Sequence, residues 1–196
     1  MKTDFYPLKR SCVCPVEASQ THEDIFKYIP LPDLTSIPTE LKLSFLEEAS
    51  VDSMKQRIIN NIDQMHSLGA ISSQEKSILN SYIDDFCAGN SINYDTILAQ
   101  ITAVPDKPFD GAISRFLVTL GRQSYCWWEH YLVAEFPNQE PPIVEIALND
   151  LLSGAVGWGW YVVSNWSHHY ESDFGMNGLN FAGQAALFGS AGAVRF

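Results

Sequence analysis

The sequence predicts a mainly α-helical fold, an irregular bundle of about five to six helices that follows a proline-rich, extended N-terminal arm. Three observations support this prediction. Apolar residues recur at three- and four-residue steps through most of the chain after residue 40. Serine and asparagine stand where helices should start, and glycine stands where they should stop. Five of the ten prolines fall in the first 40 residues.

Each of those prolines removes a backbone donor and disfavours the helical conformation of the residue before it. We therefore expect residues 1–40 to form an extended arm, and their many apolar side chains indicate that it lies over the helical body. Residues 41–196 are expected to form a single helical domain. Shorter amphipathic helices should occupy residues 41–105, and aromatic and Gly/Ala-rich helices should occupy residues 110–196.

The first helical pattern starts near Thr39 and continues to Gly69, which suits a left-handed C-terminal cap. Ser50 or Val51 marks a break between a short helix and a longer one. The next helix should begin after Ser72, because Ser72-Ser73-Gln74-Glu75 has the spacing of a capping box, and it should end near Gly89. Asn93 is expected to cap a short helix that Val104-Pro105 closes.

Asp110 is expected to cap the longest helix, which extends to about Glu135 and is apolar on most sides, as a buried helix is. Residues 143 to about 166 are predicted to be helical, although their glycines weaken helix propensity and Val162-Val163 also suits a strand. A polar loop is expected from Ser164 to Gly178. The Gly/Ala-rich stretch from 179 to 194 then reads as a closely packed helix. The aromatic side chains of the C-terminal half are expected to form a core between its two long helices.

The formal net charge is -11, and no Lys or Arg occurs between Arg122 and Arg195. Nucleic acids and anionic lipid surfaces bind through cationic side chains, so neither is an expected partner of this half of the chain. The first residues lack the apolar run of a secretory signal. We therefore expect a cytoplasmic protein with reduced cysteines, and export without a leader remains an alternative.

Small residues form two ridges in the C-terminal stretch. Gly178, Ala182, Ala186 and Ser190 follow one another at four-residue spacing, and Ala185, Gly189 and Ala193 do the same. Such ridges let two helix backbones approach closely. The partner helix is either another part of the chain, such as the region from Gly154 to Gly159, or a second molecule. The predicted binding residues are Gly178, Ala182, Ala185, Ala186, Gly189 and Ala193.

A membrane-active protein, a toxin or its antagonist, is one alternative, because the run from Phe174 to Val194 is uncharged and long enough to cross about 30 Å of hydrocarbon. In this reading residues 151–194 insert as a hairpin. Polar residues inside the run and the absence of basic flanks argue against it.

A metal-dependent hydrolase is the other alternative. His168, His169, Glu171 and Asp173 gather imidazoles and carboxylates within six residues, although no zinc-helix spacing is present. Cys126 and the neighbouring pair Glu129-His130 are the groups with which they would cooperate, with Cys126 as a nucleophile. Cys12 and Cys14 are a further candidate for a soft metal. A solvated acidic loop explains the histidine cluster more simply.

The leading hypothesis is a non-enzymatic interaction or assembly protein, with a protein partner or a second copy of itself. It needs no cofactor. The sequence contains no phosphate-binding loop, dinucleotide fingerprint, calcium loop or nucleophile elbow that would favour an enzyme.

Overall fold

The computed structural model describes residues 50–135, 143–169, 174, 177–179, 181–183 and 185–186. Within these residues the chain is helical and contains no strand, which confirms the predicted mainly α-helical bundle and shows that Val162-Val163 is helical. The arm predicted for residues 1–40 lies outside the described residues. The α-helices are α3 (Val51–Ser67), α4 (Ser73–Cys87), α5 (Tyr94–Ala103), α6 (Ala112–Glu135) and α7 (Ile143–Asn165), and the 3-10 helices are η2 (Pro108–Gly111) and η3 (Trp166–His168).

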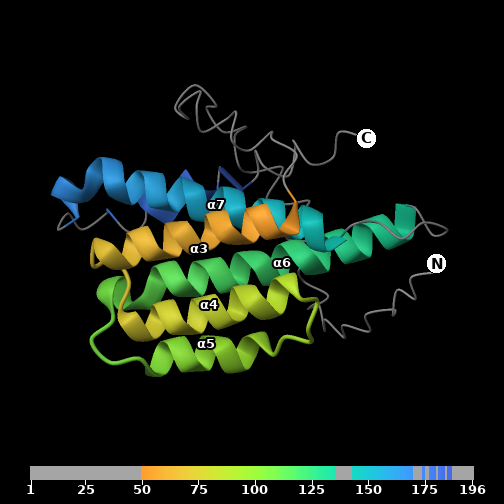
Figure 1. Cartoon of the computed structure of the whole chain (residues 1–196), viewed down its shortest axis with the longest axis horizontal. Coiled ribbons are helices and arrows are strands. Elements are labelled where there is room, and N and C mark those ends of the chain that lie inside the picture. The colour runs from red at the N-terminus through yellow and green to blue at the C-terminus, as the bar shows by residue number, and fades with distance from the viewer. Residues whose placement is uncertain are drawn as a thin grey trace.

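The five α-helices lie side by side along a common long axis (Figure 1). The most extensive contacts join α7 to α6 and to α3, and α3 in turn packs on α4. α5 lies at the edge of the bundle, where it contacts α4 and α6. The helix α7 is therefore buried along much of its length by two neighbours, which explains why its sequence is apolar on most sides.

Local sequence signals fix where the first helices begin and end. The Ser50 hydroxyl accepts a hydrogen bond from the Ser53 backbone N–H at 3.2 Å, so α3 starts where the break was predicted. Gly69 ends the helix with a φ of 75°. Asn93 caps α5 in the same way, accepting from the Thr96 N–H at 3.0 Å.

The capping box predicted at the start of α4 is present. Glu75 N–H donates to the Ser72 hydroxyl at 3.2 Å, and Ser72 N–H donates to the Glu75 carboxylate at 2.8 Å. Glu75 has no exposed surface, and its other carboxylate oxygen accepts from the Ser114 hydroxyl of α6 at 2.9 Å. A motif read from local spacing thus also joins α4 to α6, because the second oxygen of the buried carboxylate needs a donor of its own.

Asp110 does not cap α6 as predicted. An N-cap residue has an extended backbone, whereas Asp110 has φ 51° and ψ 30° and lies in η2. Phe109 before it and Gly111 after it are also left-handed, with φ values of 49° and 70°. The start of α6 is therefore shaped by an unusual turn rather than by an ordinary side-chain cap.

The described residues after α7 also differ from the sequence prediction. The polar loop expected from Ser164 to Gly178 contains η3, and Phe174, Asn177 and Gly178 are helical. The described residues among 179–186 are helical, as predicted. We call the described residues between Phe174 and Ala186 the C-terminal segment.

Candidate functional site

The site that the structure builds most clearly is a close contact on α7, where Gly154 and Gly157 lie against alanines of the C-terminal segment. A Cβ atom placed on Gly157 would stand 2.5 Å from the Cβ of Ala185 and 3.5 Å from the Cα of Ala182. A Cβ atom on Gly154 would stand 3.7 Å from the Cβ of Ala186, and only 2.4 Å from Leu120 of α6. Because glycine leaves this space open, the two backbones approach more closely than side chains would allow.

The described members of the two ridges, Ala182, Ala185 and Ala186, lie against these glycines. Ala182, Ala185 and Ala186 are all buried. We call this surface, formed by Gly154 and Gly157 of α7, the α7 groove. The intramolecular contact that the sequence suggested as one possibility is thus present in the described residues. Gly189 and Ala193, two further predicted binding residues, lie outside them.

Gly178 lies against the aromatic half of α7. A Cβ atom on Gly178 would stand 2.7 Å from two ring carbons of Trp158 and 3.0 Å from Tyr161. Trp158 is fully buried, so its ring cannot move aside without disturbing the core. Gly178 is the fourth predicted binding residue that the structure places on α7.

Aromatic rings flank the small residues on the same face. The ring of Phe181 stacks on that of Trp160, with centroids 5.1 Å apart, and lies 6.2 Å from that of Tyr161. Among the described residues, rings of α7 thus pack on the C-terminal segment. The ring centroid of Phe116 of α6 lies 6.4 Å from that of Trp158 of α7, where the aromatic core was expected. Small residues at the centre and large rings beside them give the contact both close approach and buried apolar area.

Phe174 anchors the start of the C-terminal segment and is only 2 % exposed. Its ring centroid lies 5.3 Å from that of Tyr161 and 6.5 Å from that of Trp166. On a third side it meets Phe109 of η2, with centroids 5.5 Å apart. Phe174 therefore joins the C-terminal segment to the turn that precedes α6.

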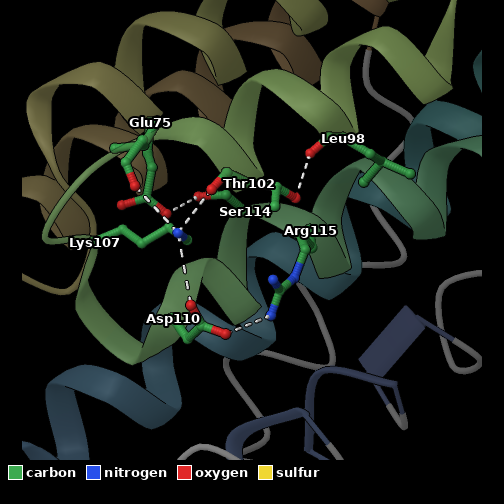
Figure 2. Close-up of polar contacts among 8 residues, drawn as sticks. Glu75, Leu98, Thr102, Lys107, Asp110, Ser114 and Arg115 are labelled. Atoms are coloured by element: carbon green, nitrogen blue, oxygen red, sulfur yellow. Dashed lines mark hydrogen bonds and ion pairs between the residues drawn. The ribbon is translucent and has the colours of Figure 1, made fainter.

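That turn carries a cluster of charged side chains (Figure 2). The Lys107 ammonium group donates to the backbone carbonyls of Thr102 and Val104 at 2.9 and 3.1 Å, near the C-terminal end of α5. The Asp110 carboxylate lies 3.6 Å from Lys107 and 3.6 Å from Arg115. Since the Asp110 side chain is 82 % exposed, these ion pairs contribute little to stability.

A buried carboxylate lies at the interface of α6 and α7. Asp150 is 4 % exposed, and its Oδ2 accepts from the Ser124 hydroxyl at 2.5 Å and from the Trp128 indole N–H at 2.8 Å. Both donors belong to α6, while the acceptor belongs to α7. A buried charge is tolerated only where donors satisfy it, so this network links α6 to α7, the two longest of the described helices.

The predicted catalytic residues are placed only in part. His168 is exposed at the end of η3, and the ring of His169 stacks on that of Trp166 with centroids 4.3 Å apart. Glu171 lies outside the described residues, as does the side chain of His130, so a hydrolase built on them stays a prediction. Cys126 is buried and disulfide-bonded, so the expectation of reduced cysteines is wrong for Cys126.

The predicted metal site is also only partly described, since Cys12, Cys14 and Asp173 lie outside the described residues. Among the residues that the structure does describe, no group of three or more His, Cys, Asp or Glu side chains is arranged to hold a metal ion. In the same parts of the chain, no helix combines the length and the apolar character that crossing a membrane requires.

Sequence reasoning missed the Ser124–Trp128–Asp150 network and the role of Phe109. Asp150 was the detectable signal, because it is the one charged residue between Glu145 and Glu171 in an otherwise apolar helix. No pattern marked Phe109, since its contact with Phe174 spans 65 residues. Comparisons of the sequence with protein-family models, with curated proteins and with solved structures find no match.

Proposed function

We propose that the protein is a non-enzymatic interaction and assembly protein, and that the contact it uses is the close packing of a small-residue helix in the α7 groove. The observation that carries this proposal is the approach of Ala185 to Gly157, where one methyl group on the glycine would overlap the alanine. Such a groove accepts only a helix with small side chains in register, which gives the contact selectivity as well as area.

In the described structure the chain fills this groove with its own C-terminal segment. The same contact can form between two chains when the segment of one molecule enters the groove of another. Such an exchange adds no new type of interaction, so it is a low-cost route to an assembly. A second copy is therefore the partner that we test first.

Two variants with complementary defects provide the test. Gly157→Leu blocks the groove and leaves the C-terminal segment intact, whereas Ala185→Leu blocks the segment and leaves the groove intact. Neither variant can make the contact alone. In a 1:1 mixture, the intact segment of the first can enter the intact groove of the second, so light scattering should report a dimer in the mixture and a monomer for each variant alone.

Gly183→Leu is the matched control, because a Cβ atom at Gly183 meets nothing within 4 Å and the native contact is kept. A mixture of Gly157→Leu with Gly183→Leu should stay monomeric, because the Gly183→Leu chain fills its own groove with its own C-terminal segment. Circular dichroism should show that all three variants keep their helices. If the complementary pair also stays monomeric over the accessible concentration range, assembly through this contact is ruled out.

A further inference from the structure

The turn before α6 contains three successive left-handed residues, Phe109, Asp110 and Gly111, and Asp106 nearby is also left-handed. Residues with a side chain visit this conformation singly and rarely form a left-handed helical turn, because Cβ crowds the following carbonyl oxygen. Gly111 fits without this penalty, whereas a Cβ atom there would stand 2.9 Å from the Lys107 side chain, which would have to shift. Phe109 and Asp110 are therefore the residues whose left-handed backbone is strained.

A strained backbone persists only where its surroundings hold it. Asp110 pairs with Lys107 and Arg115, but these exposed ion pairs are weak. Phe109 is held by packing: it is partly buried against the core, and its ring lies against that of Phe174 on the C-terminal segment. The conformation of the turn therefore depends on a residue that follows it by 65 positions and belongs to the segment in the α7 groove.

We propose that the turn from Asp106 to Gly111 is a strained latch, in which the ring of Phe109 holds Phe174 and thereby keeps the C-terminal segment in the α7 groove. When the segment leaves, Phe109 loses its partner and the turn can relax to an ordinary conformation. The coupling is reciprocal, so a change that relaxes the turn also favours departure of the segment. The latch thus sets how often the groove is vacant.

This inference rests on the proposed function, because it concerns the same groove, but its test uses a single chain and no partner. Hydrogen exchange is measured over residues 177–186 in the wild type and in Phe109→Ala. Loss of the ring contact should raise the exchange rate of these amides about tenfold, while the amides of α3 and α4 exchange as in the wild type. Unchanged exchange over residues 177–186 overturns the latch, whether or not chains exchange segments.

Phe86→Leu is the control for general destabilisation. Phe86 is fully buried and packs edge-on against Tyr82 and Tyr125, away from the rings that surround Phe174. This variant should not loosen residues 177–186 more than it loosens α3. If both variants loosen the segment equally relative to α3, Phe109 has no special hold on it and the latch is refuted.

The strain itself is tested by Phe109→Gly against Phe109→Ala, since both lose the ring and only glycine adopts a left-handed backbone without cost. The unfolding equilibrium constant of the alanine variant should be roughly threefold larger than that of the glycine variant. At Gln100, an exposed helical residue of α5, the order should reverse, with alanine the more stable. Finding alanine more stable at Phe109 as well would show that the turn stores no strain.

Discussion

Gly157 of α7 and Ala185 of the C-terminal segment lie so close that a Cβ atom added to the glycine would stand 2.5 Å from the alanine Cβ. Real Cβ atoms do not approach one another so closely, so the position opposite Ala185 must be glycine for the two backbones to keep this distance. The pair also shows what the small-residue ridges contact. Their described members face the protein's own α7 helix, and any partner must either replace the segment or bind elsewhere.

The close approach of Gly121 in α6 to Tyr82 in α4 provides a second pair of matched sizes. A Cβ atom on Gly121 would stand 2.0 Å from the Tyr82 hydroxyl oxygen and 3.3 Å from the ring carbon that carries it. Gly121→Ala should therefore lower the free energy of unfolding by about 1–3 kcal/mol, despite the better helix propensity of alanine. Urea denaturation measures the change.

Tyr82→Phe in the Gly121→Ala background is the matched rescue, because it removes the oxygen that clashes. The double variant should recover part of the lost stability. If Gly121→Ala lowers the free energy of unfolding equally with Tyr82 and with Phe at position 82, the clash with the hydroxyl oxygen does not cause the loss of stability.

The buried network at Asp150 predicts a stability effect at its two donors. Trp128→Phe and Ser124→Ala each remove one donor from a buried carboxylate oxygen, so each should lower the free energy of unfolding by about 1–3 kcal/mol. Thermal or urea denaturation provides the measurement. Gln123→Ala, at an exposed position of the same helix, should change stability by less than about 0.5 kcal/mol. Equal effects at all three positions would refute a structural role for the network.

The capping box of α4 predicts unequal effects of its two partners. Ser72→Ala removes one helix cap and should cost about 1 kcal/mol. Glu75→Ala removes the reciprocal cap and also leaves the Ser114 hydroxyl without its buried acceptor, so it should cost more. Denaturation of both variants and of Ser114→Ala measures the difference. A Glu75→Ala effect no larger than that of Ser72→Ala would show that the link to α6 contributes nothing.

The sequence predicted well where structure depends on neighbours in the chain. Ser50, the Ser72–Glu75 capping box, Asn93 and Gly69 act where their spacing indicated, since caps and stops are local interactions. The glycines of α7 did not break the helix, because contacts with α3, α6 and the C-terminal segment outweigh their low propensity.

The sequence failed where distant contacts decide the backbone. Asp110 precedes a long helix as an N-cap would, yet ion pairs and the packing of Phe109 on Phe174 accompany a left-handed turn there. For the same reason, the sequence indicated the small residues of the candidate site but not which of them are in contact. Four-residue spacing identified one surface of the contact, with Ala182, Ala185 and Ala186, and suggested the region from Gly154 to Gly159 as its partner. Only the folded chain shows that Gly157 faces Ala185.

A double-mutant cycle on Gly157 and Ala185 tests most directly that the C-terminal segment occupies the α7 groove. Gly157→Ala introduces the overlapping methyl group and should lower the free energy of unfolding by about 1–3 kcal/mol, whereas Gly183→Ala, in open space, should not lower it. Adding Ala185→Gly removes the overlap, so urea denaturation should report a coupling energy of about 1–2 kcal/mol between the two changes. Effects that add within about 0.5 kcal/mol would contradict the contact.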